Sequence, residues 1–151
     1  MCKNSFVHYL TKVLVDIMFY GGIVCCILAP FVLPHVLTYL GYRQSTFVAY
    51  SIIILLSGLC ALCIVWQLKS MLKTLLGGNP FVPQNVNCLR ICSVASFLIA
   101  IIYVFKLFLL LFTPSSLILV IIFSLLGLFC LTLKDVFKQA IVYKEENDWT
   151  V

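Results

Sequence analysis

Charged side chains are scarce in this sequence. Asp, Glu, Lys and Arg make up only 10% of its 151 residues, whereas 64% of the residues are hydrophobic. Soluble domains carry roughly a quarter charged residues and about half apolar ones. A chain of this size cannot hide so much apolar surface from water, so its solvent must be lipid. The shortage of charge therefore excludes a water-soluble domain and predicts an all-α integral membrane protein.

Groups that carry out chemistry are also scarce. The two histidines, His8 and His35, lie at the two ends of the first hydrophobic run, and no Ser-His-Asp or Cys-His arrangement can be assembled around them. The pair Gly77-Gly78 lacks the strand, the lysine and the hydroxyl residue of a phosphate-binding loop. We therefore expect no enzymatic activity, no catalytic residue and no cofactor.

The eight cysteines lie mostly within apolar runs, where a thiol packs as a small hydrophobic group. Cys60 and Cys63 form a C-x-x-C pattern, and Cys88 and Cys92 follow the next polar segment. A C-x-x-C pattern inside a helix lacks the turn that brings two ligands onto one zinc ion. We expect neither a metal site nor a structural disulfide.

Long apolar runs dominate the chain. A helix crosses the hydrocarbon with about 20 residues at about 1.5 Å each. Pro30 and Pro34 are expected to end the first run, and short helical extensions are expected after the second and fourth spans. A polar connector, 67–90, separates two hairpins, and a polar tail covers 134–151. The predicted architecture is one domain, a bundle of membrane spans at about 13–33, 47–66, 91–112 and 117–133.

Small residues recur at a spacing of four along the third span, at Cys92, Ser96 and Ala100. Such a ridge lets two helices approach closely in a membrane. The turn at 113–116 is very short, so the third and fourth spans are expected to be antiparallel neighbours.

Lysine and arginine are distributed unevenly between the two sides of the predicted bundle. The two connectors on one side share only Arg43, whereas the termini and the connector 67–90 carry Lys3, Lys12, Lys69, Lys73, Arg90, Lys134, Lys138 and Lys144. Loops rich in these residues stay in the cytoplasm. We therefore expect a plasma-membrane protein with both termini cytoplasmic. The net charge of +5 then reflects topology, and no nucleic-acid binding is expected.

The connector contains the most distinctive motif of the sequence. Gly78-Asn79-Pro80-Phe81, followed by Asn85-Val86 and Leu89-Arg90, resembles the pattern G-x-P-F-x-x-x-N-V-x-x-L-R. The tail 145–151, with the sequence EENDWTV, is similar to an ending close to E-N-D-L-T-V/I. Both patterns are typical of the DUF2975 family, small bacterial four-span membrane proteins of unknown function. Gln84 and Trp149 depart from the acidic and aliphatic residues usual at their positions.

The resemblance implies little about mechanism, because the family has no established activity. Its members are often encoded beside a small helix-turn-helix regulator. The resemblance therefore implies a role in membrane-linked regulation, with a cytoplasmic helix-turn-helix regulator as a candidate partner.

Two ionisable residues, Asp16 and Lys106, lie within the expected spans. Charges inside a membrane are candidates for function, and Asp16 would suit the coupling carboxylate of a small transporter. Asp16 is also close enough to the interface to pair with Lys12, one helical turn earlier. Lys106 lies on the order of 9 Å from the end of its span, a depth that a lysine covers by snorkelling. Their depths place Asp16 and Lys106 near opposite faces of the membrane.

Two functions remain open from the sequence. The first is a non-enzymatic regulatory or interaction protein that uses the connector and the tail to bind a regulator, another membrane protein or a second copy of itself. Its candidate residues are Pro80, Phe81, Asn85, Arg90, Glu146, Asn147, Asp148 and Trp149. In a structural alternative, connector and tail pack on each other and close the cytoplasmic end. The second function is a small oligomeric transporter or channel subunit with Asp16 as the coupling residue. The few polar groups in the spans favour the first.

Overall fold

The computed structural model of the chain describes residues 3–41, 46–78, 80–110 and 113–148. These residues form four helices and no strand: α1 (Lys3–Tyr39), α2 (Phe47–Leu76), α3 (Pro83–Leu109) and α4 (Pro114–Asp148). Each helix is long enough to cross a membrane and contains an apolar window with a mean hydropathy between 2.1 and 2.8. The predicted all-α architecture with four membrane-spanning helices is confirmed.

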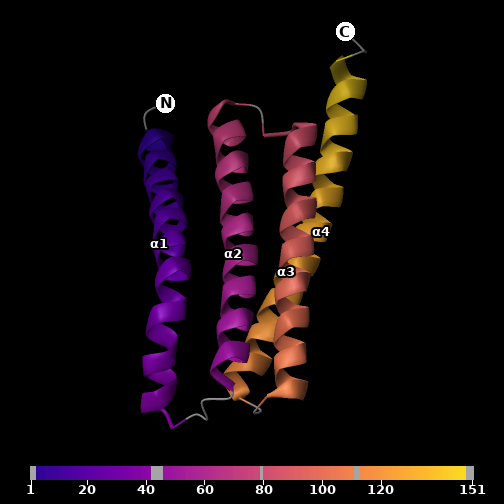
Figure 1. Cartoon of the computed structure of the whole chain (residues 1–151). Helices are drawn as coiled ribbons and strands as arrows, with labels where there is room; N and C mark the ends of the chain where they lie inside the picture. Colours follow the sequence, from indigo (N-terminus) through magenta and orange to yellow (C-terminus); the bar gives the residue numbers. More distant parts are fainter. Residues whose placement is uncertain (1–2, 42–45, 79, 111–112, 149–151) are drawn as a thin grey trace.

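The helices pack in chain order, α1 on α2, α2 on α3 and α3 on α4, and the α3–α4 seam is the most extensive. The start of α1, the end of α2, the start of α3 and the end of α4 lie together at one end of the molecule (Figure 1). We call this the terminal end, and the other end the opposite end. The arrangement gathers at the terminal end most of the segments that carry lysine and arginine.

All four helices are longer than the spans expected from the sequence. α1 has 37 residues and α4 has 35. At about 1.5 Å per residue each exceeds 50 Å, whereas the hydrocarbon is roughly 30 Å thick. α2 continues to Leu76 and α4 to Asp148, in agreement with the predicted helical extensions. The helix ends therefore project beyond the hydrocarbon.

Two prolines behave differently from the prediction. Pro30 and Pro34 lie inside α1, which continues to Tyr39. Each proline removes one backbone hydrogen bond, but lipid offers an unwound backbone no water to replace the others. Leu37, beyond both prolines, is buried with 6% exposure. The packing of Leu37 and the need to keep the remaining backbone hydrogen bonds therefore both favour a continuous helix.

α3 begins at Pro83, eight residues earlier than the predicted start of the third span at Ile91. Val82 precedes it in an extended conformation, and the fixed φ of proline suits the first turn of a helix. The connector between α2 and α3 is therefore reduced to 77–82. Within it Gly78 has a φ of 83°, a left-handed conformation that favours glycine.

The core lies on α3. Its predicted ridge of Cys92, Ser96 and Ala100 is buried, with 2%, 0% and 5% exposure. Ser96 Oγ donates a hydrogen bond to the Cys92 carbonyl at 2.8 Å, so no polar atom of this serine faces lipid unpaired. Across the seam, a Cβ added to Gly127 of α4 would lie 3.0 Å from ring carbons of Phe97. Small residues thus allow α3 and α4 to approach closely.

The seam gives a stability prediction. Gly127→Leu should lower the thermal unfolding midpoint of the protein in detergent, because inserting carbon atoms into a packed seam costs about 1–3 kcal/mol. Gly21→Leu is the matched control, since a Cβ at Gly21 of α1 meets nothing within 4 Å. Both changes give the same gain in helix propensity, so the difference isolates packing. A thermal scan with a thiol-reactive dye measures the two unfolding midpoints. Equal midpoints for the two variants would contradict close packing at Gly127.

Candidate functional site

The connector at the terminal end is locked by one buried side chain. Asn85, with 1% exposure, donates from Nδ2 to the Pro80 carbonyl at 2.7 Å and accepts on Oδ1 from Thr74 Oγ1 at 2.7 Å. Beside it, Gln84 Nε2 donates to Ser70 Oγ at 3.4 Å. These bonds join the end of α2, the connector and the first turn of α3. Asn85 therefore positions the connector and is not itself exposed to a partner.

Phe81 attaches the connector to α4. Its ring lies 5.5 Å from the ring of Phe137, with the two planes tilted by 50°, and its side chain remains 42% exposed. The sequence had suggested that the tail packs on the connector through Trp149. Trp149 lies outside the described residues, and the contact that the structure describes is made by Phe137, within α4 and within the predicted tail 134–151.

The end of α4 projects past the connector (Figure 1). From Lys138 to Asp148 the helix continues for roughly another 16 Å at about 1.5 Å per residue. Tyr143 on this segment is 70% exposed, and Glu145 and Glu146 are exposed beside it. We call the segment 138–148 the α4 tip. It includes Asn147 and Asp148 in its last turn.

The candidate interaction residues therefore fall into three places. Pro80, Phe81 and Asn85 form the locked connector against α4. Arg90 is exposed on α3, about two turns from the connector. Glu146 belongs to the α4 tip. The structure brings the first group together and places Arg90 and Glu146 on two other helices of the same terminal end, α3 and α4.

Asp16 pairs with a different lysine from the one expected. Its carboxylate lies 2.7 Å from Lys69 Nζ on α2, so the predicted pairing with Lys12 is wrong. Lys69 Nζ also lies 5.5 Å and 5.6 Å from the ring centroids of Phe19 and Tyr20. The antiparallel packing of α2 on α1 brings this cation to a carboxylate beside two aromatic rings, a more favourable site than the exposed turn around Lys12. The ion pair links α1 to α2.

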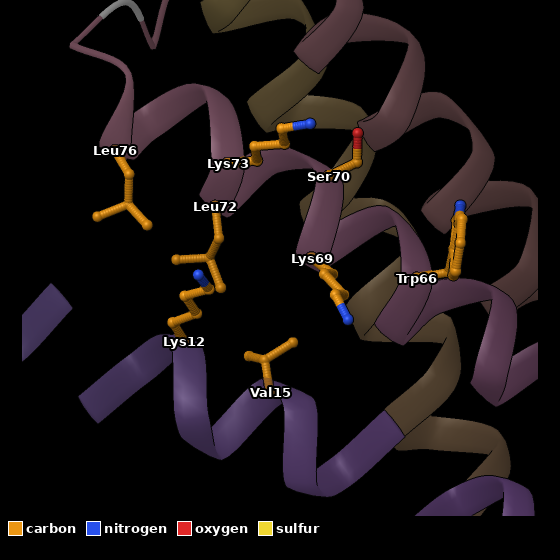
Figure 2. Close-up of a pocket in the computed structure, with 8 residues that line it drawn as sticks. All are labelled: Lys12, Val15, Trp66, Lys69, Ser70, Leu72, Lys73 and Leu76. Carbon is orange, nitrogen blue, oxygen red and sulfur yellow. The ribbon is translucent and has the colours of Figure 1, made fainter. Parts of the chain in front are cut away.

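A groove of about 620 Å³ lies beside this ion pair, between α1 and α2 (Figure 2). It combines cationic and hydroxyl side chains with aliphatic walls and one aromatic ring, and its lining consists of Lys12, Val15, Trp66, Lys69, Ser70, Leu72, Lys73 and Leu76. Sequence reasoning did not find it, because its two sides lie far apart in the chain. The available signal was the lysines at the polar ends of the first two apolar runs.

Lys106 belongs to a separate network at the opposite end. Its Nζ donates to Ser116 Oγ at 2.6 Å and to Thr113 Oγ1 at 3.3 Å, and these two hydroxyls lie 2.6 Å apart. The ammonium group also lies 5.4 Å and 5.8 Å from the rings of Tyr50 and Tyr103. Lys106 therefore links the end of α3 to the start of α4 through hydrogen bonds. Its distance from the terminal end agrees with the expected separation from the aspartate.

The comparison with protein families adds one finding. The model of DUF2975, described as a protein of unknown function, matches residues 27–151. The chain belongs to the DUF2975 family. Neither the curated proteins nor the solved structures contain a match. Because the match begins at residue 27, the connector and the α4 tip of this DUF2975 protein lie inside the family region, whereas Lys12 and Asp16 lie before it.

The connector of the DUF2975 protein gives the second prediction. Asn85→Ala should make chymotrypsin cleave after Phe81 on the order of tenfold faster, because an unmade buried hydrogen bond costs about 1–3 kcal/mol and the connector opens more often. Asn87→Ala, at an exposed position of the same turn, should leave the rate unchanged. Equal rates in the two variants would show that Asn85 does not hold the connector.

The ion pair gives the third prediction. Asp16→Lys or Lys69→Asp alone should lower the unfolding midpoint, since each places two like charges 2.7 Å apart in the present geometry. The double variant restores an opposite pair and should recover most of the loss. A thermal scan of the four proteins in the same detergent measures the coupling. Additive losses in the double variant would show that the two residues do not interact.

Proposed function

We propose that this DUF2975 protein is a non-enzymatic plasma-membrane protein that binds a protein partner at its terminal end. The observation that carries the proposal is the α4 tip, which extends roughly 16 Å past a locked connector and exposes Tyr143. A span alone needs no such extension, because about 20 residues already cross the hydrocarbon.

The surface at the terminal end has properties of a protein-binding surface. Tyr143 is a large exposed aromatic side chain of the kind that anchors interfaces. Glu146, three residues on, shares the helix face of Tyr143, and Lys138 and Glu145 place charges of both signs on the other faces of the α4 tip, which suits a polar rim. Asn85 and Phe81 hold the connector in one conformation, and a preformed surface loses less conformational entropy on binding.

The distribution of lysine and arginine supports a cytoplasmic location for the terminal end, and hence a cytoplasmic partner. A helix-turn-helix regulator is the partner that the family resemblance suggests. Another membrane protein or a second copy of the chain are the alternatives that the experiment below separates.

Transport remains the second candidate, and it has less support. A coupling carboxylate must change its protonation or its bound ion during transport, whereas Asp16 is compensated by Lys69 in an ion pair with about a third of each side chain exposed. The pair lies near the terminal end and not at the membrane centre. A transporter would also require that Asp16→Asn abolish ion- or pH-dependent flux in vesicles.

Site-specific photocrosslinking tests the proposal. A benzoylphenylalanine at Tyr143 should capture a specific protein in native membranes, because the α4 tip extends beyond the lipid. The control is the same probe at Phe108 of α3, which is 84% exposed near the opposite end. With the captured partner purified, Tyr143→Ala should weaken binding about tenfold or more, as expected for an aromatic anchor, and Asp16→Asn should leave it unchanged. Capture of lipid alone at Tyr143 would contradict the proposal, and capture of the same chain would replace the partner by a homo-oligomer.

A further inference from the structure

The groove between α1 and α2 has no role in the proposed partner binding. Figure 2 shows Lys12 of α1 and Lys69 of α2 reaching into the space between the helices, with Val15 and Leu72 pointing toward one another there. Ser70 and Lys73 also belong to its lining on α2, but Figure 2 shows their polar ends directed away from α1. Its volume of about 620 Å³ lies in the range of sites that bind small molecules.

The charge of the groove favours an anion. Three lysines line it, and the nearby carboxylate of Asp16 is engaged by Lys69. Lys12 and Lys73 are exposed and form no ion pair within the part of the chain that the structure describes. Ser70 Oγ accepts a hydrogen bond from Gln84 of α3, so it is already engaged on the α3 side of α2. The lysines of the groove therefore offer cationic donors to an acceptor such as a phosphate.

The remaining lining favours an anion that carries hydrocarbon. Val15, Leu72 and Leu76 supply aliphatic walls beside the lysines. Trp66 is 57% exposed, and tryptophan in a spanning helix typically lies at the level of the lipid headgroups. α1 packs mainly on α2, so the hydrocarbon can reach the aliphatic side of the groove directly. Cationic groups next to aliphatic walls at this depth match the two parts of a phospholipid.

We propose that this groove binds an anionic phospholipid, with the phosphodiester at the lysines and the acyl chains against the aliphatic walls. Basic pockets between spanning helices are suited to such headgroups. The proposal requires only that the helices lie in a membrane. It holds whether or not the α4 tip binds a protein partner.

Trp66 provides a probe inside the groove. In a Trp149→Phe background it is the only tryptophan, so quenching by lipids brominated near the headgroup reports contact with the groove. We expect brominated phosphatidylglycerol to quench Trp66 at concentrations about 30-fold lower than brominated phosphatidylcholine, since the two lysines without an ion pair each favour an anionic headgroup. The full chain is titrated in neutral detergent.

Variants at exposed lysines separate the groove from general surface charge. Lys12→Gln with Lys73→Gln should abolish the preference for phosphatidylglycerol, whereas Lys138→Gln with Lys144→Gln, an equal charge change on the α4 tip, should retain it. A preference retained in the first pair, or lost equally in both pairs, would overturn the proposal. Displacement of brominated phosphatidylglycerol by millimolar inorganic phosphate would also overturn it, because the site would then recognise phosphate without acyl chains.

Discussion

The constraint on which this structure depends is that lipid cannot hydrogen bond to the backbone. Every peptide group within the hydrocarbon must find its partner inside the chain, and a continuous helix supplies all of them. This explains why α1 continues through Pro30 and Pro34, which would favour a break in water. It also explains why, in the part of the chain that the structure describes, the helices are interrupted only at the two ends of the molecule. At the terminal end Asn85 donates to a backbone carbonyl of the connector, and at the opposite end Lys106 donates to hydroxyls at the start of α4.

Helix association in lipid has no hydrophobic driving force, because lipid tails are as apolar as leucine. Close packing and polar contacts must therefore hold the helices together. The α3–α4 seam uses Gly127 beneath the ring of Phe97, and α1 approaches α2 where a Cβ at Gly58 would lie 2.7 Å from Cys26 Sγ. The pair Asp16–Lys69 adds a polar contact between α1 and α2. Thr74 of α2 and Asn85 of α3 form a hydrogen bond between the middle two helices. Each neighbouring pair of helices is thus held by a close approach or a polar contact.

The sequence was sufficient for features that depend on local pattern. Hydropathy predicted four membrane-spanning helices, and the spacing of Cys92, Ser96 and Ala100 predicted the buried face of α3. Features that depend on packing between helices were not predictable. The partner of Asp16 comes from the antiparallel alignment of α2, which the sequence does not specify. The start of α3 at Pro83 had a local signal, since proline is favoured in a first turn, but the prediction had placed Pro83 within the polar connector 67–90.

The row arrangement also bears on function, because it leaves α1 packed mainly on α2. Val15 and Leu37 are its buried apolar residues, while Ile17, Ile27 and Phe31 are more than 60% exposed. Most of the described surface of α1 is therefore left for lipid. The groove lies at the contact between α1 and its main neighbour, since Lys12 and Val15 form its α1 side and α2 forms the other. An anionic lipid there would bridge α1 and α2, and α2 is joined through Asn85 to the connector that supports the α4 tip. The proposed lipid groove and the proposed protein-binding surface would thereby be connected through α2.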